Sequence, residues 1–211
     1  MDIILQFFGY ISENWFHLIT LTFVHILMVI IGLGLSLLIG VPLGILSAKN
    51  EKFAAPILAL ANIIQVFPAL ALLAILMVFL GLGFKTVIVA LLLYSLLPII
   101  RNTYIGLKEV DETISQAGIG VGMTPFQLLL KVQLPLSVPF LLAGVRVATI
   151  VAISLATIAP FIGGGGLGED ILSGINTHQP VKMYSGGILA ALLAIFIDLI
   201  LGKVQERVEY K

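Results

Sequence analysis

The stretch Phe16–Ala48, FHLITLTFVHILMVIIGLGLSLLIGVPLGILSA, contains no Asp, Glu, Lys or Arg. A transmembrane helix needs about 20 consecutive, mostly apolar residues, and this run is long enough to supply one. The whole chain has the same character, because 60% of its 211 residues are hydrophobic, 10% are charged, and its mean hydropathy is +1.17. Soluble domains carry about 25% charged residues. The sequence therefore predicts an all-α integral membrane protein.

Further apolar segments follow this first one, and together they predict a single membrane domain over residues 1–211. The second segment contains Pro68, which removes a backbone donor and should bend its helix. A polar stretch, 101–135, separates the third segment from the fourth. The five expected transmembrane helices cover roughly residues 20–44, 55–80, 84–104, 138–161 and 183–202.

The cationic side chains are distributed unequally between the two ends of these spans. Cytoplasmic loops of membrane proteins carry an excess of Lys and Arg. If residues 101–135 are cytoplasmic, the far side keeps only Lys85 and Lys182. The cytoplasmic side then collects Lys49, Lys52, Arg101, Lys108, Lys131, Arg146, Lys203, Arg207 and Lys211. We therefore expect a multi-pass protein of the plasma membrane, with its N-terminus outside and its C-terminus inside.

Composition also excludes several classes of function. The formal net charge is zero, which gives no reason to expect a nucleic-acid partner. The absence of cysteine excludes disulfides, thiolate metal sites and cysteine nucleophiles. His17, His25 and His178 are far apart in the sequence and lack metal-ligand spacing, so we expect no metal site. The sequence shows no convergent set of nucleophiles and acids, and an enzyme is the least favoured reading.

The polar stretch contains an amphipathic run, QAGIGVGMTPFQLLLKVQLP, Gln116–Pro135. Thr124 and Gln127 have the spacing of a capping box, with Pro125 at the first helical position. The helix that they begin should stop at Pro135, because the residue before a proline avoids the helical region. Its expected apolar face consists of Phe126, Leu129, Leu130 and Leu134. This face could pack on the spans of the same chain or enter a groove in a partner.

A second short helix is expected upstream, with Asp111 as its N-cap. Glycine has the lowest helix propensity apart from proline, so Gly118, Gly120 and Gly122 should weaken and end this helix. The two short helices would then be joined by a glycine hinge.

The spacing of this run resembles the cytoplasmic loop of ABC importer permeases, which reads E-A-A, three residues, G, nine residues, I, any residue, L-P. Gln116-Ala117-Gly118 stands in place of the first triplet, and Gly122, Leu134 and Pro135 match by identity. Gln116, Gly118 and Val132 depart from the pattern, so a salt bridge made by the first acid is in doubt. The resemblance implies a coupling loop, residues 111–135, that enters a cleft on an ATPase subunit. The implied coupling residues are Gln116, Ala117, Gly118, Gly122, Met123, Thr124, Pro125, Phe126, Leu134 and Pro135.

Three further stretches, QVFPALALLAILMVFLGLG, LLLYSLLPIIRNTYIGL and IAPFIGGGGLGEDILSGI, resemble permeases of importers for glycine betaine, carnitine or choline. The resemblance covers about residues 18–205. It implies a permease that pairs with a second copy or a homologous chain, with a cytoplasmic ATPase dimer and with an external substrate-binding protein. ATP and Mg²⁺ would be bound by the ATPase subunits, and this chain would hold no cofactor. Methionine-type permeases share the five-span core, so a methionine-like substrate is one alternative, and a secondary transporter is another.

Candidate pathway residues lie around the proline of the second span. Asn62, Gln65 and Pro68 form a polar and kinked patch, and the aromatic residues Phe67 and Tyr94 are further candidates, although they are spread out and predict no aromatic cage. Polar groups inside a membrane usually face the bundle interior. They could line a pathway or form hydrogen bonds between helices, which are worth about 1 kcal/mol each.

Two other features have structural readings. Arg146 and Asp198 lie inside the cytoplasmic ends of the fourth and fifth spans, where they could form a mutual salt bridge or extend to the interface. The glycine-rich segment 162–170 lacks the Gly-Lys-Ser/Thr of a phosphate-binding loop. We expect it to allow tight turns and close backbone packing near the extracellular mouth.

Overall fold

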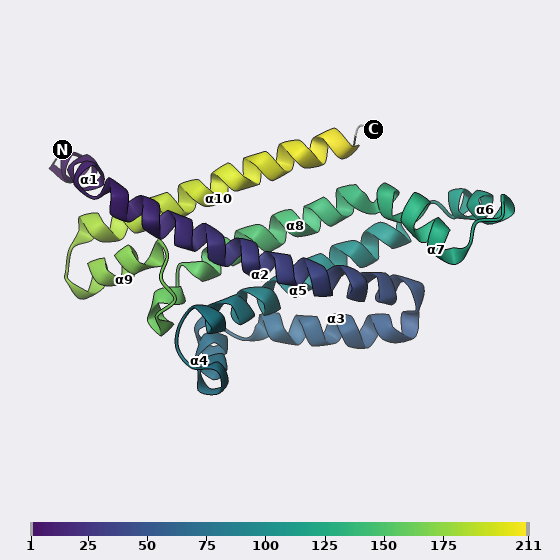
Figure 1. The fold of residues 1–211 in the computed structure, drawn as a ribbon, viewed down its shortest axis with the longest axis horizontal. Coiled ribbons are helices and arrows are strands. Elements are labelled where there is room, and N and C mark those ends of the chain that lie inside the picture. Colours follow the sequence, from purple (N-terminus) through teal and green to yellow (C-terminus); the bar gives the residue numbers. More distant parts are fainter. Residues whose placement is uncertain (1, 210–211) are drawn as a thin grey trace.

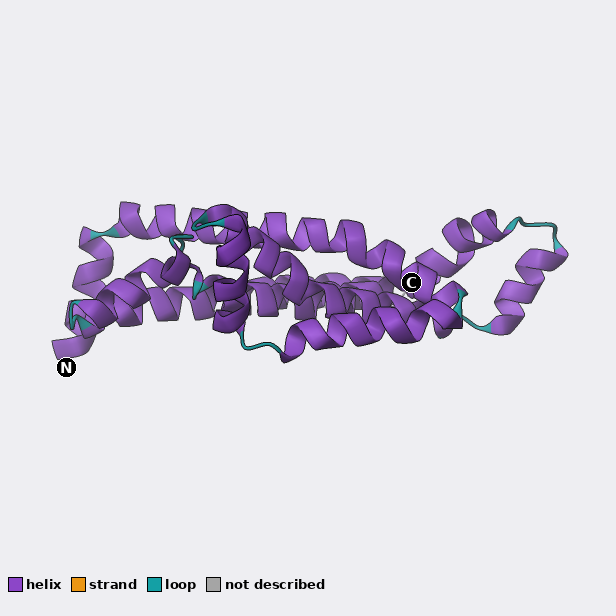
Figure 2. Ribbon diagram, turned by 90° about the horizontal axis from the view of Figure 1, so that it is seen from below, coloured by secondary structure: helices purple, strands orange, loops and turns teal. Residues whose placement is uncertain are grey.

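The computed structural model describes residues 2–209, and all the secondary structure in that range is helical, as the sequence predicted (Figures 1 and 2). The long helices run side by side, with α6 and α7 at one end of the bundle and α1 and α9 at the other (Figure 1). The helices are α1 (Asp2–Glu13), α2 (Trp15–Lys49), α3 (Glu51–Val66), α4 (Ala69–Leu80), α5 (Phe84–Lys108), α6 (Glu112–Gly120), α7 (Pro125–Leu128), η1 (Leu129–Gln133), α8 (Leu134–Ala156), η2 (Ala159–Ile162), α9 (Gly168–Asn176) and α10 (Pro180–Glu209).

Four helical segments in the described range are long and apolar enough to cross a membrane: α2, α5, α10, and α7 to α8 taken together. The helices α3 and α4 pass the same test as a pair, but they are bent by 100° at their junction. The five expected spans are therefore present if this bent pair counts as one. With 16 residues, α3 is about 24 Å long, which is shorter than the ~30 Å hydrocarbon core. The helix α4 turns across the bundle instead of extending α3 (Figure 1).

The centre of the bundle is the contact between α2 and α5. Along α2, small residues recur at four-residue intervals at Gly32, Ser36, Gly40 and Gly44, and all four are buried. Small residues at this spacing let two membrane helices approach closely. A Cβ atom added at Gly44 would lie 2.5 Å from Thr103 Cβ, which is closer than van der Waals contact allows. The small size of the residues along this stripe therefore sets the distance between α2 and α5.

The glycine-rich segment is closely packed, as expected. A Cβ atom at Gly164 would lie 2.5 Å from Val87 Cγ2, and one at Gly168 would lie 1.8 Å from the carbonyl oxygen of Thr157. Because these positions lack a side chain, the turn between η2 and α9 packs closely against α5 and the end of α8.

A buried carboxylate, which sequence reasoning did not single out, joins four helices at this end of the bundle. Asp170 on α9 is 1% exposed and accepts a hydrogen bond from Tyr10 Oη of α1 at 2.9 Å. Its other oxygen lies 3.0 Å from His17 Nε2 of α2 and 3.9 Å from Lys182 Nζ of α10. Burial and the hydrogen bond to Asp170 raise the pKa of the Tyr10 hydroxyl. Asp170 therefore fixes α1 across the end of the bundle.

Of the two alternatives for Arg146 and Asp198, the structure shows the mutual salt bridge. Arg146 Nη2 donates to Asp198 Oδ2 at 2.7 Å, and Arg146 Nε donates to the second carboxylate oxygen. This two-pronged geometry is the strong form of an Arg–carboxylate pair. It connects α8 to α10, a helix that is otherwise mostly exposed outside the bundle.

We expect alanine at Gly44 to destabilise the protein and alanine at Gly34 to leave it unchanged or slightly more stable. Both changes raise helix propensity equally, but only Gly44 faces α5, whereas nothing lies within 4 Å of a Cβ at Gly34. Overpacking of this kind costs about 1–3 kcal/mol. Thermal unfolding of the purified protein in detergent would measure the difference. Equal midpoints for the two variants would show that the stripe does not set the α2–α5 distance.

Candidate translocation groove and coupling segment

The junction of α3 and α4 is held in place by hydrogen bonds to α5. Pro98 has no N–H group, so the carbonyl of Tyr94, four residues earlier, lacks its normal helical donor. Gln65 Nε2 on α3 donates to this carbonyl at 3.0 Å. Unsatisfied backbone groups cost several kcal/mol in lipid, and the Gln65 amide removes this cost.

The reciprocal bond runs from α5 to the break itself. The hydroxyl of Tyr94 donates to the carbonyl of Phe67, the last residue before Pro68. Phe67 has extended backbone geometry at the end of α3, so its carbonyl has left the helical ladder. Gln65 and Tyr94 therefore each satisfy a carbonyl that a proline has released on the other helix. This exchange stabilises the bend at a defined place.

Two adjoining hollows lie beside this junction and form the candidate groove. One, of about 360 Å³, is bordered by Gln65, Arg101 and Asn102; the other, of about 390 Å³, is bordered by Tyr94 and Ser154. Val151 of α8 lines both hollows, so they lie next to each other along α8. The remaining lining residues are apolar: Ala69, Leu97, Pro98, Ile105, Val147, Ile150, Leu155 and Ile158.

The structure brings some of the predicted pathway residues together and separates one. Gln65, Phe67, Pro68 and Tyr94 all meet at the junction. Asn62 is exposed, lines neither hollow, and makes no side-chain hydrogen bond within residues 2–209. Arg101, Asn102 and Ser154 border the groove, although sequence reasoning did not place them there. An isolated cation within an apolar helix was the available signal for Arg101.

The segment 111–135 projects from the end of the bundle opposite α9 (Figure 1). Its first helix, α6, begins at Asp111, whose side chain accepts a hydrogen bond from the Thr113 amide at 2.7 Å, as predicted. Hydrogen bonding by the Thr113 side chain, together with this backbone bond, lowers the pKa of the Asp111 carboxyl. The helix passes through Gly118 and ends at Gly120, so this run of glycines ends it, as expected.

Gly122 ends α6 through its backbone conformation. Its φ of +86° belongs to the left-handed region, which glycine enters without steric cost. The amides of Gly122 and Met123 then bond to the carbonyls of Ile119 at 2.9 Å and Gly118 at 3.1 Å. These two bonds form the glycine-terminated helix end known as a Schellman motif.

The turn leads directly into α7, and the predicted capping box is present. Thr124 Oγ1 accepts from the Gln127 amide at 3.3 Å, and the Gln127 side chain accepts from the Thr124 amide at 3.0 Å. Gly118 allows α6 to lie on α7, because a Cβ there would be 2.6 Å from Leu128 Cδ1. The caps thus hold an apolar tip in the open, where Ile119, Val121 and Phe126 are 61%, 78% and 67% exposed.

The expected stop at Pro135 was wrong, as was the single apolar face. The chain passes from α7 through a π-helical turn, Leu129–Gln133, into α8 without leaving the helical conformation. In this wider turn the Leu134 amide reaches back to the Leu129 carbonyl, and Pro135 falls in the first turn of α8, where a proline is tolerated. The added residue also rotates the faces: Leu129 is buried, while Leu130 is exposed.

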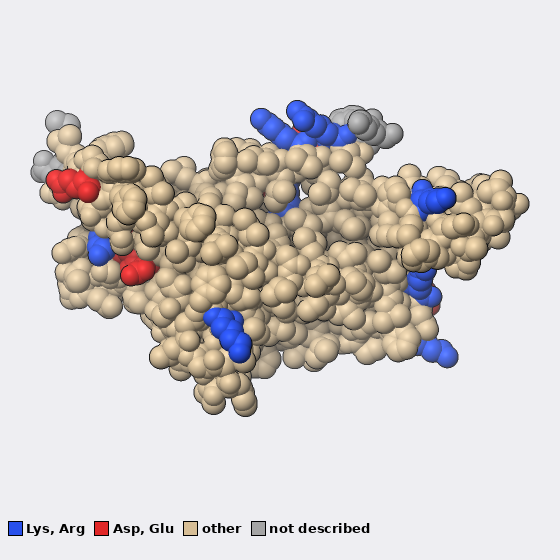
Figure 3. Space-filling model, viewed as in Figure 1, with Lys and Arg blue, Asp and Glu red and all other residues tan. Residues whose placement is uncertain are grey.

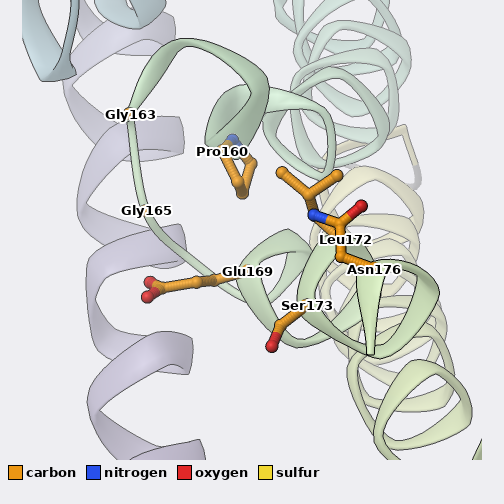
Figure 4. Close-up of a pocket in the computed structure, with 7 residues that line it drawn as sticks. All are labelled: Pro160, Gly163, Gly165, Glu169, Leu172, Ser173 and Asn176. Atoms are coloured by element: carbon orange, nitrogen blue, oxygen red, sulfur yellow. The ribbon is translucent and has the colours of Figure 1, made fainter. Parts of the chain in front are cut away.

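A third hollow, of about 380 Å³, opens at the opposite end of the molecule between η2 and α9 (Figure 4). Pro160, Leu172 and Ser173 line it together with Glu169, its one charged side chain. Ser173 Oγ accepts a hydrogen bond from Lys182 Nζ at 2.9 Å, so this hollow adjoins the Asp170 cluster.

The sequence is similar to that of known transport proteins. A family model described as "Binding-protein-dependent transport system inner membrane component" matches residues 40–210. The choline transport system permease protein OpuBB of Bacillus subtilis is 41% identical over 198 residues, which cover 94% of this chain and 91% of that protein. The glycine betaine/carnitine/choline transport system permease protein OpuCB of the same organism is 39% identical, with coverages of 98% and 95%. The osmoprotectant import permease protein OsmW of Salmonella typhimurium is 36% identical, with coverages of 93% and 94%.

Solved structures share the fold at lower identity. An inward-facing structure of the MetNI methionine ABC transporter superposes with a TM-score of 0.82 at 22% identity, covering 93% of this chain and 98% of that chain. An amino acid ABC transporter crystallised with histidines gives a TM-score of 0.68 at 20% identity, with coverages of 98% and 97%. The helical arrangement is therefore that of a known class of transporter subunit.

We expect Gln65→Leu to lower stability by about 1–3 kcal/mol, because it leaves the carbonyl of Tyr94 without a donor in an apolar environment. Asn62→Leu is the matched control, since it lies one turn earlier on α3 and makes no side-chain hydrogen bond within residues 2–209. Thermal unfolding in detergent would compare the two variants. If both behave like the unmodified protein, the junction does not depend on the Gln65 amide.

Proposed function

The chain belongs to the family of binding-protein-dependent transport system inner membrane components, and on that basis we propose that it imports a quaternary-ammonium osmoprotectant. It is a multi-pass permease subunit of an ABC importer, which works with ATPase and substrate-binding partners and is not itself an enzyme. Glycine betaine, carnitine and choline are the proposed substrates.

The observation that carries this proposal is near-full-length similarity to permeases named for those compounds, at 36–41% identity. A methionine-like substrate is the second candidate, because the fold matches a methionine transporter at 22% identity. Identity at that level supports only a shared fold, so the more similar relatives are the better guide to the substrate.

The lining of the groove suits the passage of the substrate better than its tight binding. Arg101 is its only charged lining residue, so a quaternary ammonium meets no carboxylate there. Tyr94 is its only aromatic lining residue, and its hydroxyl is engaged with Phe67, so the groove offers no aromatic cage for cation–π binding. Selection of the substrate would then reside in the external binding protein.

Residues 111–135 are the proposed coupling segment. Its tip presents Ile119, Val121 and Phe126 to solvent, and three caps fix its shape. An apolar helix face of this kind can occupy a groove in a partner protein. In the proposed assembly, two such permease chains, identical or homologous, each place this tip in one subunit of an ATPase dimer. ATP-driven closure of the ATPase then moves the tips together and opens the groove outward.

The proposed orientation places this segment in the cytoplasm, with the N-terminus outside and the C-terminus inside. Lys and Arg side chains gather towards the coupling end and along the C-terminal part of α10 (Figure 3), as the positive-inside rule requires of a cytoplasmic face. The expected cytoplasmic Lys211 lies outside the described residues.

Single cysteines would test the orientation, because the chain has none of its own. We expect a membrane-impermeant maleimide to label Gln179→Cys in intact cells and to label Val121→Cys only after permeabilisation. Both positions are exposed, so a difference in labelling reports the side of the membrane. The reverse pattern would place the coupling segment outside and overturn the proposed contact with an ATPase.

Reconstitution would test the substrate. Vesicles that contain this permease with its ATPase should accumulate labelled glycine betaine, carnitine or choline when its binding protein and ATP are supplied. Omission of ATP should reduce the uptake to background. Preferential accumulation of methionine would favour the second candidate, and uptake by this chain alone under an ion gradient would identify a secondary transporter.

A further inference from the structure

An apolar groove runs between α2, α8 and α10, on the side of the bundle away from the junction of α3 and α4. Its volume is about 190 Å³, and its lining includes Ile30 and Leu33 of α2 and Leu193 and Leu201 of α10. Thr149 is the only polar residue among those that line it, and its hydroxyl donates to the Val145 carbonyl at 2.7 Å. The groove therefore presents hydrocarbon to whatever occupies it.

The length of the groove corresponds to part of one membrane leaflet. Leu193 and Leu201 are eight residues apart on α10, which is about 12 Å along the helix. One leaflet contributes about half of the ~30 Å hydrocarbon core. Since α2, α8 and α10 all pass through the membrane, a groove of this length opens to the acyl chains of a single leaflet.

A cation lies at the end of the groove marked by Leu201. A Cβ atom at Gly202, the next residue, would lie 3.4 Å from Arg146 Cζ, so the guanidinium rests against α10 at this level. Asp198 accepts hydrogen bonds from Nε and Nη2 of Arg146, and no acceptor within residues 2–209 bonds to Nη1. The Arg146 side chain is 38% exposed. Nη1 of the guanidinium, with both of its N–H groups, thus stays available beside the groove.

The charges around this end are unequal. Arg146, Lys203 and Arg207 are basic, whereas Asp198 and Glu206 are acidic, which leaves one net positive charge. Lys203 and Arg207 are both exposed. Figure 3 shows cationic side chains along this part of α10. An apolar channel of one-leaflet length with a cationic end is complementary to a phospholipid whose headgroup is anionic.

We propose that the groove between α2, α8 and α10 is a binding site for an anionic phospholipid, with one acyl chain along the groove and the phosphate at Arg146 and Lys203. Arg146 Nη1–H donates to a phosphate oxygen while Asp198 fixes the orientation of the guanidinium. The bound lipid fills the space that separates α10 from α2 and α8. The site depends on membrane insertion, which the family establishes, and not on the transported substrate.

Tryptophan quenching by brominated lipids would test the site, because Trp15 is the only tryptophan in the chain. In a Trp15→Phe background, Ile30→Trp places the probe at the rim of the groove, and Leu199→Trp places it on α10 away from the groove. Ile30 and Leu199 are 62% and 57% exposed, so both probes reach lipid. The purified full-length permease chain, without partner subunits, would be reconstituted in mixtures of brominated phosphatidylglycerol and phosphatidylcholine.

For each probe, the lipid preference is the ratio of quenching by brominated phosphatidylglycerol to quenching by brominated phosphatidylcholine. We expect this ratio to be about 3- to 10-fold higher for Ile30→Trp than for Leu199→Trp. The double change Arg146→Leu and Asp198→Leu removes the headgroup donor without leaving either charge unpaired, and it should reduce this preference to the control value. Lys203→Gln should reduce it in part.

Two results would overturn the proposal. Equal lipid preference at the two probes would mean that the groove attracts no particular headgroup. Absence of quenching by either lipid at Ile30→Trp, with normal quenching at Leu199→Trp, would mean that a second polypeptide covers the groove.

Discussion

The structure depends on the requirement that every backbone carbonyl inside the membrane finds a donor within the protein. Pro98 releases the carbonyl of Tyr94, and the Gln65 side chain satisfies it. The broken end of α3 releases the carbonyl of Phe67, and the Tyr94 hydroxyl satisfies that one. Each repair crosses from one helix to another, so a local defect becomes a tertiary contact.

The same requirement explains a buried histidine. At the end of α8 the Thr157 amide turns back to the Ser154 carbonyl, which leaves the Ile153 carbonyl without its helical donor. His25 of α2 is fully buried, and its Nε2 lies 3.2 Å from that carbonyl. Because a carbonyl only accepts, Nε2 carries the proton. Together with the close α2–α5 contact, this bond joins α2, α5 and the C-terminal end of α8.

Local patterns in the sequence predicted what local physics determines. Apolar length predicted the spans, Thr124 and Gln127 predicted their capping box, and the opposite charges of Arg146 and Asp198 predicted a pair. Features that require knowledge of neighbouring helices were not predictable. The sequence does not distinguish Asp170 from an ordinary loop carboxylate, because Tyr10 and His17, which contact it, lie on distant helices.

The junction between α3 and α4 was predictable only in part. A proline kink was expected at Pro68, but a kinked helix normally keeps its direction within a few tens of degrees. The observed bend of 100° is stabilised by the Tyr94 hydroxyl of α5, which bonds to the Phe67 carbonyl at the break. Its size is therefore a property of α5 as much as of Pro68.

The error at Pro135 bears directly on the proposed mechanism. A helix that stopped there would leave α7 as a separate element, joined to the membrane bundle by a flexible joint that could absorb a displacement. Instead, α7 continues through the π-helical turn into α8, which lines the groove with Val147 and Val151. A displacement of the exposed tip at Phe126 is thus carried by continuous helix to the wall of the groove. The π-helical turn lets Pro135 remain in the chain without breaking that connection.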